Sequence, residues 1–148
     1  MTTTKVTPLY VECLIQQEHY AFSISTIQEI IPMHEVTVLP GKKKNLRGVI
    51  NLRGNIIPIY CLRSMLNIPS IANTKHTRII IAQLAGKTLG LVVDCVSRVI
   101  GFSEVKPVTE QFGHKGNIFL HAIGELEGNF VGILDMQELF LQEVRGYE

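Results

Sequence analysis

The 148-residue sequence carries little charge and almost no excess of either sign. Only 18% of its residues are charged, and 14 basic against 13 acidic side chains leave a formal net charge of +1. A chain so close to neutral lacks the basic surface through which proteins bind nucleic acids and anionic membranes. The sequence therefore argues against both as ligands and favours apolar or mixed surfaces of other proteins.

Cysteine is also scarce. Cys13, Cys61 and Cys95 form no CxxC pair, which argues against a disulfide framework and a structural zinc site. The N-terminus has no apolar segment of signal-peptide type, and no uncharged apolar stretch reaches the roughly 18 residues of a transmembrane helix. We therefore expect a cytoplasmic protein with no metal, no cofactor and no direct membrane insertion.

Motifs of known catalytic chemistry are missing. The sequence contains no GxxxxGK, no GxGxxG and no nucleophile elbow, and none of its histidines forms an HxxxH or HExxH pair. Cys95 has no nearby histidine that could activate it. The run Lys42-Lys43-Lys44, with Arg47, is the only charge cluster, and it is interpreted either as a solvated loop or as a local docking patch for an acidic partner. These absences argue against an enzyme.

What the sequence does contain is a series of short β-type runs joined by turns. Period-two alternation and turn residues predict four hairpins: Tyr10–Ile15 with His19–Ile24, Val49–Leu52 with Ile56–Tyr60, Arg78–Leu84 with Leu89–Val93, and Ala122–Leu126 with Phe130–Leu134. Gly54-Asn55 and Gly128-Asn129 are the expected turn residues of two of them. Short helices are expected at Leu62–Leu66 and at Met136–Val144. The pattern predicts an all-β barrel or sandwich.

The stretch 67–77 is rich in breakers and small polar residues and divides the chain nearly in two. We expect one domain over 9–144, with a first β-subdomain over roughly 9–66 and a second over roughly 78–144.

The two halves share an apolar pattern. Placing Gly54 over Gly128, or Tyr20 over Leu89, aligns apolar positions in order along both halves. Because any two hairpins share period-two alternation, chance similarity is the alternative. A structural repeat would mean two similar β-subdomains that are each too small to fold alone.

The same overlay places Glu29 over Arg98 and Arg53 over Glu127. If Glu29 pairs with Arg53 in the first half, Arg98 should pair with Glu127 in the second, with the charges exchanged. We therefore predict both ion pairs.

Several segments, in this order along the chain, resemble the CheW family, the coupling proteins of bacterial chemotaxis arrays. They are Tyr20–Ile24, Ile27–Ile31, Leu39-Pro40, Arg47–Gly54, Ile57–Ile59, Leu62-Arg63, Gly90–Asp94 with Val96 and Val99, and Ile133–Asp135. The combination of an Asn-Leu-Arg-Gly hairpin with a Val-Val-Asp strand is specific to that family.

The resemblance implies two similar five-stranded, SH3-like β-barrels around a shared hydrophobic core, with a C-terminal helix. It implies a scaffold without catalytic activity. Its partners would be the regulatory domain of a CheA-type histidine kinase and the cytoplasmic tip of methyl-accepting chemoreceptors. The protein would then be cytoplasmic and recruited to membrane-associated receptor arrays.

The resemblance also implies a docking site, in which a receptor helix lies in an apolar groove between the barrels. Carried over position by position, its partner-binding residues are Ile27, Glu29, Gly48, Arg53, Val96 and Val99. On composition alone, aliphatic residues such as these three belong more often to the core than to an interface, and the glycine could serve only the backbone.

The sequence departs from the family pattern at Tyr60, Cys61 and Cys95. Cys61 stands where an aspartate is common, which removes a possible partner of Arg63. A divergent pathway, such as a chemosensory system that controls type IV pili or another surface behaviour, is one alternative. Others are a small-molecule sensor or enzyme that uses the groove, and a fragment of a larger kinase or of a CheV-type protein.

Overall fold

In the computed structural model the described residues, 7–108 and 120–145, form strands and a few short helical segments. The first half contains β1 (Tyr10–Ile15), β2 (Glu18–Ser23), the 3₁₀ turn η1 (Ile24–Thr26), β3 (Ile27–Pro32), β4 (Leu46–Leu52), β5 (Asn55–Cys61) and α1 (Leu62–Met65). The second half contains β6 (Arg78–Leu84), β7 (Lys87–Val93), β8 (Cys95–Ile100), β9 (Glu104–Pro107), β10 (Leu120–Leu126), β11 (Asn129–Leu134) and α2 (Met136–Arg145). The predicted all-β class and C-terminal helix are confirmed. None of the described helices is long and apolar enough to cross a membrane.

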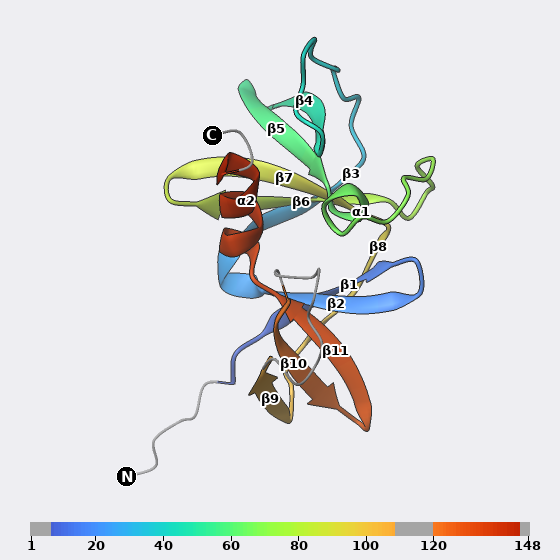
Figure 1. Cartoon of the computed structure of the whole chain (residues 1–148), viewed down its shortest axis with the longest axis vertical. Coiled ribbons are helices and arrows are strands. Elements are labelled where there is room, and N and C mark those ends of the chain that lie inside the picture. The colour runs from blue at the N-terminus through green and yellow to red at the C-terminus, as the bar shows by residue number, and fades with distance from the viewer. Residues whose placement is uncertain (1–6, 109–119, 146–148) are drawn as a thin grey trace.

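The strands form two sheets, one above the other in Figure 1, and α2 runs from the lower sheet up beside the upper one. The upper, five-stranded subdomain has the order β3-β6-β7-β5-β4, and the lower, six-stranded subdomain has the order β8-β1-β2-β11-β10-β9. One buried cluster contains Phe22 of β2, Leu62 of α1, Ile80 of β6 and Leu139 of α2. Because it draws on both sheets, the two subdomains share a core, as the resemblance implied.

Each sheet contains strands from both halves of the chain. β2 pairs in parallel with β11, and β5 pairs in parallel with β7. The chain changes sheet at η1 and again at Asp94, between β7 and β8. The expected subdomain boundaries, 9–66 and 78–144, therefore do not coincide with the sheets, and 67–77 connects two elements of the five-stranded side. The physical reason is that a two-stranded hairpin is barely stable alone, so each hairpin pairs with strands of the other half.

The internal repeat is visible in the pairing register. Cys13 lies opposite Tyr20 in the β1–β2 hairpin, and Ala82 lies opposite Leu89 in the β6–β7 hairpin, as the overlay of Tyr20 on Leu89 requires. Register shifts recur as well, because the β1–β8 and β3–β6 ladders each contain one, as do β4–β5 and β10–β11. In the overlay, each strand pair of one sheet therefore corresponds to a strand pair of the other sheet.

Even the sixth strand has a counterpart. β9 pairs with β10 at Lys106 and Ile123, and an isolated bridge joins Thr37 to Val49 of β4. In the overlay Val49 falls on Ile123. The five-stranded subdomain therefore retains a single bridge where the six-stranded subdomain has a strand.

The hairpin turns lie one residue earlier than predicted. Arg53 and Gly54 have φ angles of 52° and 87°, and Glu127 and Gly128 have φ angles of 53° and 80°. Two central residues with positive φ are the signature of a type I′ turn, whose twist matches that of the flanking strands. The asparagine after each glycine is the first residue of the following strand. The turn therefore presents a charged side chain at its first central position.

Candidate functional site

Arg53 and Glu29 form the predicted ion pair. Arg53 lies on the turn between β4 and β5, Glu29 lies on β3, and Arg53 Nη2 is 2.5 Å from Glu29 Oε2. Asn51 Oδ1 accepts the N–H of Gly54 at 2.9 Å, which holds the turn that carries Arg53. Because β3 and β4 are the outer strands of their sheet, the pair links its two edges. The Arg53 side chain is 64% exposed, so the pair contributes only about 0–1 kcal/mol to stability.

Ile27 and Val96 occupy equivalent positions on β3 and β8. Both are partly buried and pack against the cluster shared by the two subdomains. Val99, one residue before the end of β8, is 54% exposed. The structure therefore places two of the predicted aliphatic residues at the margin of the core and one on the surface.

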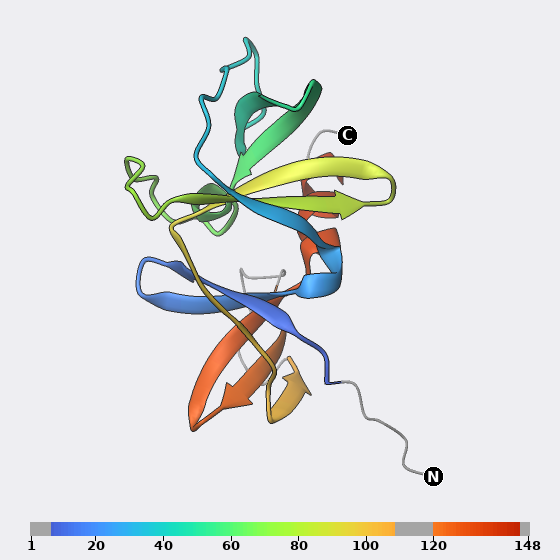
Figure 2. The ribbon, with the colours of Figure 1, turned by 180° about the vertical axis from the view of Figure 1, so that it is seen from behind.

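Ile30 of β3, which is 37% exposed, was not among the residues predicted from the sequence. The overlay contained the signal, because Ile30 falls on Val99 when Tyr20 is placed over Leu89. β3 and β8 each end their sheet, and Figure 2 shows both strands on the same side of the molecule. The repeat thus provides two edge strands with matching exposed aliphatic side chains.

Gly48 is buried and serves the backbone. Its φ is 152°, and a Cβ atom added there would lie 2.1 Å from the carbonyl oxygen of Thr37. Val49, the next residue, exchanges two backbone hydrogen bonds of 2.9 Å with Thr37. Of the two interpretations of Gly48, the local geometry supports the close approach of two backbone segments.

Replacing Gly48 with alanine should destabilise the protein by about 2–3 kcal/mol, because the new Cβ collides with backbone that is itself hydrogen-bonded. Gly41→Ala is the matched control, since Gly41 has a φ of 67° but no atom within 4 Å of an added Cβ. It should cost only about 1 kcal/mol, from the left-handed backbone alone. Urea unfolding of both variants measures the difference, and equal costs would contradict this account of Gly48.

Arg98 pairs with Glu12 instead of Glu127, so the second predicted ion pair is wrong. Arg98 Nε donates to Glu12 Oε1 at 3.1 Å, and among the described residues no ion pair joins Arg98 to Glu127. The two residues of the observed pair lie directly opposite each other in the β1–β8 ladder. In the other sheet the residue opposite Glu29 is Ile81, which offers no charge, so Glu29 pairs with the turn.

Arg63 also has a partner that the sequence analysis missed. Its Nε is 2.8 Å from Asp94 Oδ1, its Nη2 is 2.6 Å from Asp94 Oδ2, and its Nη1 donates to the carbonyl of Pro69 at 2.9 Å. Asp94 Oδ2 also accepts the backbone N–H of Gln16 at 2.9 Å. These bonds connect α1, the β7–β8 junction and the β1–β2 turn, which are the places where the subdomains meet.

The pKa of Asp94 reflects this network. Burial opposes ionisation of the carboxyl, but the hydrogen bonds from Arg63 and Gln16 outweigh burial and hold the pKa of Asp94 below its ordinary value. The hydrogen bond to Asp94 in turn raises the pKa of Arg63. Both groups are therefore charged at neutral pH.

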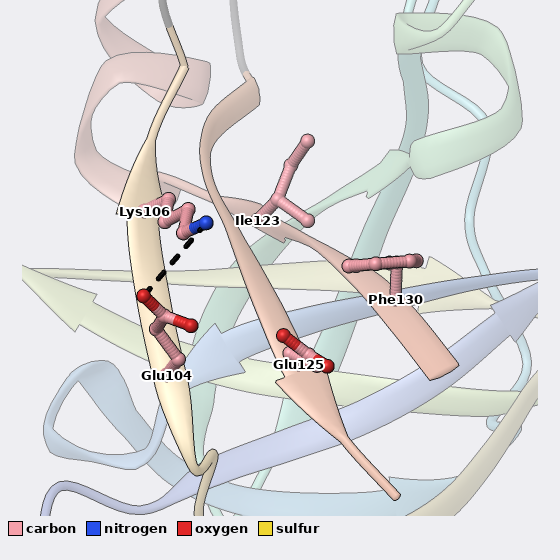
Figure 3. A pocket seen from close by; sticks show the side chains of 5 residues that line it. All are labelled: Glu104, Lys106, Ile123, Glu125 and Phe130. Atoms are coloured by element: carbon pink, nitrogen blue, oxygen red, sulfur yellow. Dashed lines mark ion pairs between the residues drawn. The ribbon is translucent and has the colours of Figure 1, made fainter. Parts of the chain in front are cut away.

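A surface hollow of about 490 Å³ lies on β9, β10 and β11 (Figure 3). It is lined by Glu104, Lys106, Ile123, Glu125 and Phe130. Phe130 is 69% exposed, and the Glu104–Lys106 pair is long, at 3.8 Å. A small-molecule sensor or enzyme would instead be expected to have a buried polar pocket with converging titratable groups.

The described residues contain no group of three or more histidine, cysteine or acidic side chains that could hold a metal ion. Cys13 is fully buried, and burial, with Glu12 nearby, raises the pKa of its thiol far above the ordinary value. A thiol held neutral in this way is a packing residue.

Comparison with known proteins then decides the family. A family model described as the CheW-like domain matches residues 9–144. This chain belongs to the CheW family. The match covers both subdomains, including β3, β8 and the β4–β5 turn.

Individual relatives agree with the family model. The chemotaxis protein CheW of Bacillus subtilis is 30% identical over 132 residues, which cover 88% of this chain and 85% of that protein. The protein of the same name from Thermotoga maritima is 30% identical over 129 residues, covering 84% of this chain and 82% of that one. The crystal structure of the scaffolding protein TtCheW from Thermoanaerobacter tengcongensis matches with a TM-score of 0.82 at 27% identity, covering 93% of this chain and 90% of that one. CheW membership places the chain among the scaffolding proteins of chemotaxis.

Proposed function

We propose that this CheW-family chain is a non-catalytic adaptor that couples transmembrane chemoreceptors to a CheA-type histidine kinase. The observation that carries the proposal is the pair of exposed aliphatic residues, Ile30 and Val99, at equivalent places on two edge strands. Exposed aliphatic side chains in matching positions suit an amphipathic partner helix. The kinase side of the proposal rests on family membership alone.

In this proposal the receptor helix lies along β3 and β8. Ile27 and Val96 form the inner part of the contact, where they continue into the shared core. Ile30 and Val99 form the outer part, and the Glu29–Arg53 pair provides a polar border on the five-stranded side. Gly48 acts indirectly, by keeping the backbone of β4 against Thr37. Recruitment to membrane-associated arrays would then occur through the receptors.

Arg53→Ala should leave the fold intact and weaken receptor binding about tenfold, which is the effect of losing one well-placed polar contact at an interface. Thermal unfolding should change little, because the ion pair is exposed. A pull-down with receptor and kinase together measures assembly. Arg78→Ala is the control, because among the described residues Arg78 bonds only to nearby backbone carbonyls, and it should assemble normally. Unchanged assembly of the Arg53 variant would count against this role.

A further inference from the structure

The six-stranded subdomain contains a buried carboxylate that the proposed site does not use. Glu12 of β1 is 1% exposed, although the equivalent residue of the other sheet is the fully buried Ile81. The fold therefore has no need of a charge at this position. A buried carboxylate destabilises a protein unless charged or hydrogen-bonding groups compensate it, so its presence requires a separate reason.

The partners of Glu12 come from the strands on either side. Arg98 of β8 donates to Oε1 at 3.1 Å, and Nδ1 of His19 of β2 lies 3.6 Å from Oε2. Both partner side chains are 49% exposed, whereas the Glu12 side chain is only 2% exposed. Burial thus fixes the Glu12 side chain, and Glu12 in turn holds the more exposed side chain of Arg98.

Arg98 lies on β8, one of the two strands of the proposed docking site. Arg98 stands between Val96 and Val99 on β8, and within the described part of the chain β8 pairs with β1 alone. The ladder between these strands shifts register between Glu12 and Cys13, so its backbone pairing is interrupted beside Arg98. The hydrogen bond between Arg98 and Glu12 holds β8 against β1 at this point, where the regular backbone pairing is interrupted.

The structure also leaves room for Arg98 to move. Glu12, His19 and Arg98 line a cavity of about 230 Å³, whose other lining residues, from β10 and β11, carry no charge. Without the Glu12 carboxylate, no other negatively charged side chain among those that line this cavity would hold the guanidinium against β1.

We infer that Glu12 is a positioning residue, which holds β8 through Arg98 and so fixes the presentation of Val96 and Val99 to a partner helix. The inference rests on the proposed function for the identity of that partner. In this inference a different ion pair fixes the docking strand in each subdomain. In the five-stranded subdomain it is Glu29 with the turn residue Arg53, and in the six-stranded subdomain it is Arg98 with the buried Glu12.

The test uses Glu12→Gln, which keeps the size of the side chain and removes its charge. Hydrogen exchange of the β8 amides should accelerate about tenfold relative to those of β3. Receptor binding should weaken about tenfold while kinase binding stays unchanged. A merely structural role would instead accelerate exchange evenly over the six-stranded sheet.

A rescue variant separates tethering from direct contact. Combining Glu12→Ile, Arg98→Glu and Glu127→Arg copies the arrangement of the five-stranded subdomain, in which Ile81 lies opposite Glu29 and the turn carries the arginine. We expect this triple variant to recover slow β8 exchange and at least part of the receptor binding. Recovery of slow exchange without any recovery of binding would mean that Arg98 contacts the receptor directly, and the inference would be wrong.

Two outcomes distinguish the inference from the proposed function. If the wild-type chain does not bind receptors, the proposed function fails, and the exchange experiment still reports whether Glu12 holds β8. If the wild type binds and Glu12→Gln matches it in both exchange and affinity, the inference alone is overturned.

Discussion

Replacing Arg63 with alanine should lower the free energy of unfolding by about 3–5 kcal/mol, the usual cost of removing one partner from a buried ion pair. The side chains of Arg63 and Asp94 are only 8% and 18% exposed. The variant leaves Asp94 with the single backbone N–H of Gln16 and leaves the carbonyl of Pro69 without its donor. Among the single substitutions proposed for this chain, this one should cause the largest loss in the free energy of unfolding.

The loss should depend on pH in a defined direction. Because the folded-state pKa of Asp94 is lowered, the stabilisation from its charge is complete above the pKa of an unfolded aspartate, about 3.9. It disappears as the pH falls through the lower folded-state pKa. The difference in stability between wild type and Arg63→Ala should therefore shrink as the pH is lowered from about 5 toward 2.

Urea unfolding at several pH values measures both effects. Arg53→Ala is the matched control, since it removes an arginine from an exposed ion pair and should cost no more than about 1 kcal/mol. If Arg63→Ala costs as little as this control, the network around Asp94 is not what joins the subdomains.

Val99→Asp should weaken receptor binding about 100-fold, because it places a charge where an apolar side chain would be buried against the partner helix. The free protein should stay folded, since Val99 is already 54% exposed. Aspartate is a poor strand residue, so a stability cost of about 1 kcal/mol is expected.

Val105→Asp is the control for that cost. Val105 is 44% exposed and lies on β9, which belongs to the same sheet as β8 but is its opposite edge. It should lose the same stability and keep full receptor binding. Equal binding by the two variants, measured by titration with a receptor fragment, would remove β8 from the proposed site.

The local elements could be read from the sequence because their signals are local. Period-two alternation and turn residues identified the hairpins, and the order of apolar positions revealed the repeat. The pairing of strands between the halves could not be read in this way. A strand that is apolar on one face does not specify its neighbour, and parallel pairs such as β2 with β11 join segments far apart in the sequence.

The charged pairs show the same limit at the level of single residues. The ion pair between Glu29 and Arg53 was predicted from the sequence and is confirmed. For Arg98 the overlay predicted Glu127, but Glu12 lies directly opposite it in the sheet. Whether Arg98 pairs with Glu12 or with Glu127 depends on the register of β1 against β8, and no local sequence pattern predicts that register.

Co-sedimentation tests directly whether this one chain joins receptors to a kinase. Receptor-bearing membranes, a CheA-type kinase and this protein are mixed, pelleted and compared with mixtures that lack one component. The account predicts that the kinase pellets with the receptors when this protein is present and much less without it, and that Val99→Asp abolishes the difference. Kinase that pellets equally well without the protein, or protein that stays in the supernatant with receptors present, would contradict the account.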